Sequence, residues 1–230
     1  MGRVAELGSL GRSMPSKQKH REAEIALHYA IRNQRVEEVA QRLRDGVDPN
    51  AFDDKSRNFQ YAFTALCTAV SSAARTISTT RMELIEAVKE LNPNKPPVDV
   101  RADRAEAMEI LRLLLAAGAN PNHPTVSRTP LSLAVSTGDA ELVQVLLDAG
   151  ADPAGPGWSP FSKLPRPKGG LAFYANAIHE AAQKGFADIV RLLRSRGADT
   201  AAQNHEGKTA LQLAVEHGHS EVVRILQEHE

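Results

Sequence analysis

The chain has 230 residues, of which 42% are hydrophobic and only 4% aromatic, a composition that suits Ala- and Leu-rich helices better than one large core. Its 28 basic residues balance 28 acidic ones, so no net positive charge attracts nucleic acid. The single cysteine, Cys67, excludes an internal disulfide, and no apolar run approaches the length of a membrane span. We therefore expect a soluble protein of the cytoplasm, with the nucleus as the alternative compartment, and no membrane partner.

The N-terminal segment, residues 1–20, is rich in Gly, Ser and basic residues and shows no apolar periodicity. No apolar stretch follows Arg3, so the pattern does not predict a signal peptide. We expect a disordered basic tail over residues 1–20 and one folded domain over residues 21–230.

Residues 129–153, TPLSLAVSTGDAELVQVLLDAGADP, predict one complete helix–turn–helix unit. Thr129 can cap the first helix, and Pro130 suits a first helical position, where no amide donor is needed. Gly138 separates the two helices, and Gly150 ends the second in a left-handed conformation. Neither short helix can bury its apolar face alone, so the unit needs similar neighbours.

Four other segments match the start of this unit. TPLSLA (129–134) has counterparts in IALHYA (25–30), TALCTA (64–69), NAIHEA (176–181) and TALQLA (209–214). The second helices end alike, in RLRDGVDPN, LLLAAGANPN, LLDAGADP and LLRSRGADT, and Thr209 follows Asn176 at an offset of 33. On these copies the chain resembles the ankyrin-repeat family, whose signature is T-P-L-H-x-A. The resemblance implies an all-α solenoid of about five helix–turn–helix repeats.

Both ends of this solenoid are expected to be polar. Repeat one carries Gln41 and Arg42 where repeat three carries Val145 and Leu146, and the chain ends in QEHE. Terminal repeats need a polar outer face for solubility.

Repeat two contains an insertion between its helices, at about residues 76–103. Thr64 and Gly118 are 54 positions apart, whereas the equivalent positions of repeat three, Thr129 and Gly150, are 21 apart. The inserted sequence predicts a helix over residues 81–91 and a Pro-rich return, after which the second helix resumes at Ala105.

Two of the loops that connect the repeats, here called fingers, are enlarged. The offset between the cap positions of repeats one and two is 39, and that between repeats three and four is 47, against a period of 33. These fingers hold eight of the ten aromatic residues: Phe52, Phe59, Tyr61, Phe63, Trp158, Phe161, Phe173 and Tyr174. Such rings commonly anchor partners; the alternative is that each finger folds on its own rings.

The two long fingers flank a short one that carries His123, Ser127 and Arg128, so we predict a cleft on the concave face as the main binding site. The alternative is that the finger between repeats three and four covers an apolar flank. By resemblance, ankyrin proteins bind partners through finger tips and the concave face of the first helices. The aligned positions are Arg32, Asn33, Ser71, Ser72, Ser136, Thr137, Gln183, Lys184, Glu216 and His217 on the helices, and Arg128, His205, Glu206 and Lys208 on the fingers.

The favoured function is therefore non-enzymatic recognition of a protein or peptide, without a cofactor or metal. The predicted contact residues are Phe59, Tyr61, His123, Arg128, Trp158, Phe161, Tyr174, Ser136, Thr137, Gln183, Lys184 and His217. One alternative is a small-molecule-binding or enzymatic ankyrin protein that uses the cleft. Another is a structural subunit that docks through the insertion at residues 76–103.

The remaining reactive side chains favour structural roles. By resemblance, His28 and His179 occupy the signature histidine, which ties down the backbone of a neighbouring finger. Cys67 occupies the same slot in repeat two and is expected to point inward, without a base to activate it. His217 and His219 lack the cysteine or carboxylate spacing of a zinc site.

Overall fold

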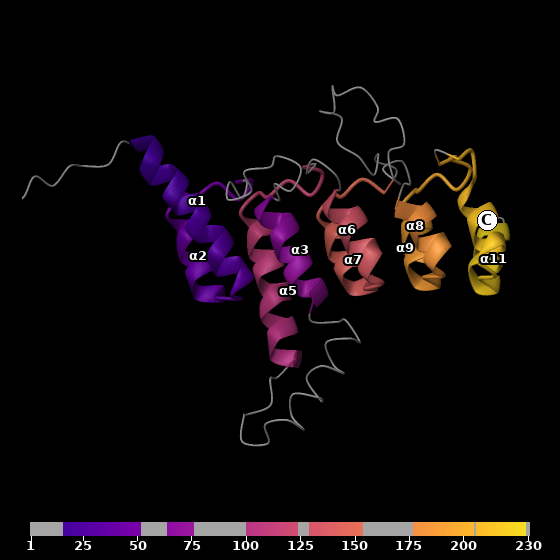
Figure 1. Cartoon of the computed structure of the whole chain (residues 1–230), viewed down its shortest axis with the longest axis horizontal. Coiled ribbons are helices and arrows are strands. Elements are labelled where there is room, and N and C mark those ends of the chain that lie inside the picture. The colour runs from indigo at the N-terminus through magenta and orange to yellow at the C-terminus, as the bar shows by residue number, and fades with distance from the viewer. Residues whose placement is uncertain are drawn as a thin grey trace, which may run out of the picture.

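Figure 1 shows the computed structural model, in which pairs of helices stand side by side along the long axis of the molecule. The structure describes residues 16–51, 64–75, 100–123, 129–153, 177–204 and 206–228. These residues form ten helices: α1 (Ser16–Arg32), α2 (Val36–Arg44), α3 (Ala65–Arg75), α5 (Val100–Ala116), α6 (Pro130–Thr137), α7 (Ala140–Asp148), α8 (Ala177–Lys184), α9 (Ala187–Ser195), α10 (Ala210–Glu216) and α11 (Ser220–Gln227).

The helices pack in two layers. The first helices of the repeats contact one another in the order α1, α3, α6, α8, α10, and α9 of the second layer packs between α7 and α11. Each first helix also packs on the second helix of its own repeat. The described residues contain no β-strand; Gln203 and Thr209 form an isolated antiparallel bridge. The expected all-α solenoid of helix pairs is confirmed.

The predicted helix caps are present in the structure. The Thr129 side chain accepts a hydrogen bond from the Ser132 amide at 3.1 Å, and Pro130 occupies the first turn. Thr64 accepts in the same way from the Cys67 amide at 3.2 Å. Thr209 forms a reciprocal capping box with Gln212, whose side-chain oxygen accepts from the Thr209 amide at 2.8 Å. These threonines satisfy amides that a helix start leaves without partners.

Glycines make most of the described turns within and after the helix pairs, whereas Gln34, with a φ of +56°, lies in the turn between α1 and α2. Gly138 has a φ of +77° and Gly150 a φ of +88°, as expected for left-handed helix ends. The turns within the pairs also touch the next repeat: a Cβ built on Gly138 would lie 2.9 Å from the Phe186 ring. A Cβ on Gly185 would lie 2.5 Å from Nδ1 of His219.

The buried apolar side chains of both layers form one continuous core along the stack. Burying a Leu or Ile of this kind contributes roughly 1.5–3 kcal/mol. The largest fully buried side chains come from all five repeats: Leu27, Ile31, Leu66, Ile110, Leu111, Leu114, Leu142, Leu146, Ile178, Ile189, Leu193 and Ile225.

The structure differs from the sequence expectations at three places. Helix α1 begins at Ser16, so residues 16–20, assigned to the tail, are helical. Helix α5 begins at Val100 instead of Ala105, because the residues between them include good helix formers such as Arg and Ala. The C-terminal end is not uniformly polar, since Val215 is 60% exposed.

Several predicted features lie outside the described residues: tail residues 1–15, insertion residues 76–99 and the aromatic stretches at 52–63 and 154–176. Among the helices that the structure describes, none is both long and apolar enough to cross a membrane.

Candidate functional site

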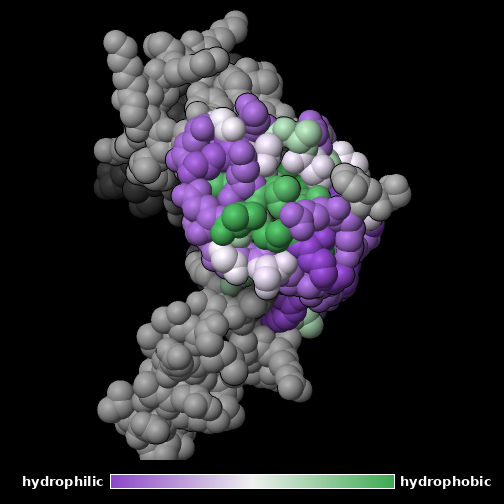
Figure 2. All heavy atoms as spheres, turned by 90° about the vertical axis from the view of Figure 1, so that its right-hand side faces the viewer, coloured by the Kyte–Doolittle hydropathy of each residue, from purple (hydrophilic) through white to green (hydrophobic). Residues whose placement is uncertain are grey.

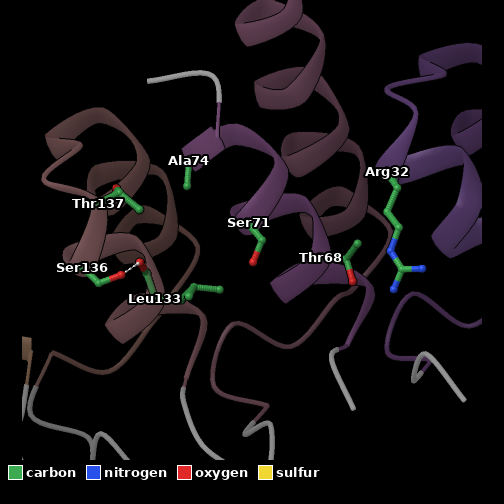
Figure 3. A pocket seen from close by; sticks show the side chains of 7 residues that line it. All are labelled: Arg32, Thr68, Ser71, Ala74, Leu133, Ser136 and Thr137. Carbon is green, nitrogen blue, oxygen red and sulfur yellow. Dashed lines mark hydrogen bonds between the residues drawn. The ribbon is translucent and has the colours of Figure 1, made fainter. Parts of the chain in front are cut away.

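A hollow of about 450 Å³ lies between the first helices of repeats one, two and three. Figure 3 shows Arg32 reaching in from α1, while the other side chains come from α3 and α6. We call it the α1–α3–α6 hollow. Its lining residues are Arg32, Thr68, Ser71, Ala74, Leu133, Ser136 and Thr137. Four of them are positions that the repeat alignment predicts on the concave face: Arg32, Ser71, Ser136 and Thr137.

The hollow owes its shape to short side chains near the ends of first helices. The Ser136 hydroxyl donates to the Leu133 carbonyl at 2.7 Å, and the Thr137 hydroxyl donates to the Ala134 carbonyl at 2.6 Å. Their protons are therefore satisfied within their own helix. The Ser136 oxygen keeps acceptor capacity, and the Thr137 oxygen already accepts from the Asp139 amide at 3.2 Å. Arg32, exposed at the end of α1, adds guanidinium donors. The lining thus offers both donors and acceptors, as a peptide backbone requires.

Lys184 links the next repeat to this hollow. Its ammonium donates to the Ser136 carbonyl at 2.8 Å and lies 3.2 Å from the Glu180 carboxylate. A cation at this carbonyl stabilises the negative end of the α6 dipole. The structure therefore brings the predicted residues Ser136, Thr137 and Lys184 together.

Gln183 and His217 form a second group, at the ends of α8 and α10. The Gln183 carbonyl accepts a hydrogen bond from Nε2 of His219 at 2.9 Å. The rings of His217 and His219 are stacked, with centroids 6.2 Å apart and planes 8° from parallel. Gln183 and His217 are both exposed, and His219 connects them.

The other predicted contact residues belong to the fingers. His123 is half-buried in the short middle finger, and its amide donates to the Asn120 carbonyl at 3.1 Å. Outside the described residues lie Phe59, Tyr61, Arg128, Trp158, Phe161 and Tyr174. The aromatic cleft that these residues would form stays a prediction.

Two asparagines that sequence reasoning missed join successive fingers. The Asn50 side-chain oxygen accepts from the Asn120 amide at 2.8 Å. The Asn122 side-chain oxygen accepts from the Asp152 amide at 2.8 Å, and its nitrogen donates to the Gly150 carbonyl at 2.9 Å. The signal was available, because a Pro-Asn pair follows the second helix in both repeats.

The signature histidines hold finger backbone, as the resemblance implied. Nε2 of His28 lies 3.0 Å from the Ala51 carbonyl, and Nε2 of His179 lies 2.9 Å from the Ala202 carbonyl. Because a carbonyl only accepts, Nε2 carries the proton in the neutral ring. Burial lowers the pKa of His28 to about 4 and also lowers the pKa of His179. Both rings are therefore neutral structural donors at physiological pH.

Cys67 is buried, as expected for its slot. Burial raises the pKa of its thiol to about 12, so the thiolate needed for nucleophilic chemistry does not form near neutral pH. Within the described ranges, no three His, Cys, Asp or Glu residues gather in a way that could hold a metal ion.

Comparison with known families agrees with the repeat pattern. A model of the single ankyrin repeat matches residues 24–54 and 127–155. A model of three tandem ankyrin repeats matches residues 165–230. The chain belongs to the ankyrin-repeat family.

Among known proteins, the chain is similar to relatives of two kinds. It is 34% identical to human cyclin-dependent kinase inhibitor 2A over 123 residues, which cover 52% of this chain and 69% of the relative. It is 33% identical to rat cyclin-dependent kinase 4 inhibitor B over 122 residues, which cover 52% of this chain and 82% of that relative. A probable rice E3 ubiquitin-protein ligase, XBOS33, is 41% identical over 93 residues, but these are 40% of this chain and only 16% of that protein. The repeats and these relatives identify a protein-interaction module.

Proposed function

We propose that the chain binds a partner protein or peptide through the α1–α3–α6 hollow and the adjoining surface of α8 and α10. The observation that carries this proposal is the convergence of Arg32, Ser71 and Ser136 from three repeats on one hollow. These residues are far apart in the sequence and meet there only because the repeats stack.

The chemistry of the hollow favours an extended peptide or a protein loop. Hydroxyl oxygens and the Arg32 guanidinium can pair with the amides and carbonyls of a backbone. A typical small-molecule site is a closed cleft that buries most of its ligand, whereas this hollow is open to solvent. Because the lining sits on helices packed into a continuous core, little order has to be gained on binding.

The finger aromatics would extend this surface. Tyr61, Trp158 and Tyr174 belong to the two fingers that flank the middle one in the sequence. Large rings in such positions supply apolar anchors beside the hydrogen-bonding groups of the hollow, a combination common in protein interfaces.

A cyclin-dependent kinase is the first partner to test. Two of the relatives are inhibitors of such kinases by name, and the similarity spans about half of this chain. An enzyme bound in this way would be held through the recognition surface, and this chain would contribute no catalytic group.

The proposal is tested by affinity purification from native cells with tagged full-length protein. Arg32→Glu reverses an exposed charge at the hollow, and Arg44→Glu is the matched control at the exposed end of α2, in the other helix layer. We expect specific partners to be lost about tenfold or more with Arg32→Glu and kept with Arg44→Glu. Partners that bind both variants equally would contradict the use of this hollow.

The fingers need their own experiment, in which Trp158→Ala/Tyr174→Ala replaces two rings at once. Loss of the same partners with unchanged thermal stability supports the anchoring role. Unchanged partners and unchanged stability would remove the fingers from the binding surface.

A further inference from the structure

The last helix pair, α10 and α11, presents apolar side chains at the C-terminal end of the stack. Figure 2 looks onto that end and shows an apolar area surrounded by hydrophilic residues. Val215 is 60% exposed, and Leu211, Val223 and Leu226 are half-buried. We call these four residues the C-terminal face.

The same positions are buried in the interior repeats. Repeat five follows repeat four at an offset of 33, so the C-terminal face corresponds to Ile178, Ala182, Val190 and Leu193. Its counterparts in repeat three are Leu131, Val135, Val143 and Leu146, and in repeat two Leu66, Val70, Leu111 and Leu114. None of these twelve side chains is more than 3% exposed. The counterparts in repeat four are covered by the next repeat, whose helices α10 and α11 pack on α8 and α9. The C-terminal face therefore has the character of a repeat-stacking interface, and among the described helices none other than α8 and α9 packs against the pair α10 and α11.

Ion pairs join the second helices at two of the junctions between repeats. Arg112 of α5 lies 3.6 Å from the Glu141 carboxylate in the first turn of α7, and Arg191 of α9 pairs with Glu221 in the first turn of α11. Repeat three carries Gln144 at this position, so the series is not continuous. Arg224 follows Arg191 by one repeat period, and within its own repeat it pairs with Glu221 at 2.8 Å and Glu228 at 2.5 Å. An incoming helix pair with a carboxylate in the first turn of its second helix would form the equivalent pair with Arg224.

The first helix pair, α1 and α2, carries an exposed aromatic ring and an exposed carboxylate that could meet the C-terminal face. Tyr29 in α1 is 49% exposed, whereas its counterparts Thr68 and Leu213 are only 5% and 4% exposed. The other two counterparts, Leu133 and Glu180, are half-buried. Glu37 is exposed in the first turn of α2 and precedes the turn glycine Gly46 by the same interval as Glu141 precedes Gly150. Tyr29 and Val215 are the large hydrophobic residues that stand exposed within the described ranges, and they lie on the two end repeats.

We propose that the C-terminal face binds the first helix pair, α1 and α2, of a second copy of this chain. Val215 then lies against the Tyr29 end of the neighbouring copy, and Arg224 pairs with its Glu37. Two different surfaces meet in this head-to-tail contact, so association continues beyond a dimer unless a ring closes. The contact extends the repeat stack from one chain to the next and does not depend on the function of the α1–α3–α6 hollow.

Sedimentation velocity of the full chain between about 1 and 100 μM tests the proposal. We expect the average mass to rise with concentration and to pass that of a dimer. Val215→Asp should abolish the rise, while Ala117→Asp, an equal charge change at an exposed position after α5, should leave it unchanged. Because Val215 is largely exposed, circular dichroism of Val215→Asp should still show a folded protein.

A charge exchange identifies the partner surface. Arg224→Glu and Glu37→Arg should each shift association to about tenfold higher concentration, because each places like charges together in the contact. An equimolar mixture of the two variants should restore it, since every contact between unlike copies regains an opposite pair. A monomer at all concentrations overturns the proposal. A mass that stops at a dimer and ignores Glu37→Arg also overturns it, because the C-terminal face would then pair with itself.

Discussion

At the scale of the residue, His28 shows how one side chain can serve two repeats. Its Nε2 donates to the finger carbonyl of Ala51, and its Nδ1 lies 3.1 Å from the hydroxyl of Thr68 in the next repeat. His179 has the same carbonyl bond, but its buried Nδ1 has no hydrogen-bond partner among the described residues. The reason is visible in the sequence, because repeat five carries Leu213 where repeat two carries Thr68.

The neutral state of His28 predicts a pH dependence of stability. The unfolded chain binds a proton at this histidine near pH 6.5, whereas the folded chain resists protonation down to about pH 4. The stability that the neutral ring contributes is therefore fully present above pH 6.5. As the pH falls from 6.5 to about 4, the free energy of unfolding decreases by about 3 kcal/mol in total. Urea unfolding of the wild type and His28→Gln at pH 7 and pH 4.5 measures it. An equal loss in both proteins would assign the effect to other groups.

Gly185 is constrained both by its positive φ and by the side chain of His219, and a comparison with Gly197 separates the two effects. Its φ of +75° disfavours any residue with a Cβ, and that Cβ would meet His219 at 2.5 Å. Gly197 has a φ of +86° but no atom within 4 Å of a built Cβ. We expect Gly197→Ala to cost about 1–2 kcal/mol and Gly185→Ala to cost more, in thermal unfolding. Equal costs would show that His219 moves aside freely.

At the scale of the element, the helices depend on their neighbours. Most span only about two turns, which is too short for a stable isolated helix in water. Contacts between helices therefore carry the stability, and polar links fix the register. Asp139 is an example: its Oδ1 caps α7 by accepting from the Glu141 amide at 3.0 Å, and its Oδ2 lies 2.6 Å from the Arg104 guanidinium of α5.

Two substitutions at Asp139 separate its role as the N-cap of α7 from its ion pair with Arg104. Asp139→Asn keeps an N-cap acceptor and loses the ion pair, so we expect a loss of about 1 kcal/mol. Asp139→Ala loses both and leaves α7 amides without a partner, which should cost about 2–3 kcal/mol. Chemical denaturation of both variants gives the order. A smaller loss for Ala than for Asn would contradict the capping role.

At the scale of the whole molecule, the repeats form a row in which the described helices of each pair pack mainly on those of the adjacent pairs (Figure 1). The stability of such a stack is close to a sum of repeat and interface contributions, so repeats with one neighbour open most easily. We expect amides of α10 and α11 to exchange with solvent faster than those of α6 and α7 at low protein concentration. Hydrogen exchange with mass spectrometry measures this order, and uniform protection would argue for a single cooperative unit.

The sequence alone determined the features that follow from the repeat pattern: five helix pairs, threonine caps in three repeats, glycine turns, the histidine bonds to two fingers and the inward position of Cys67. Each depends on residues close in the chain or on a slot that recurs at a fixed spacing, so a pattern reveals it. It also placed Arg32, Ser71, Ser136 and Thr137 on one face.

Only the tertiary structure showed that those four residues share a hollow, that Lys184 reaches the Ser136 carbonyl, and that Val215 remains exposed at the end of the stack. The physical reason is that these properties belong to the junction between repeats. Val215 and the buried Val135 occupy equivalent positions, and the difference between them is whether another helix pair packs against the residue.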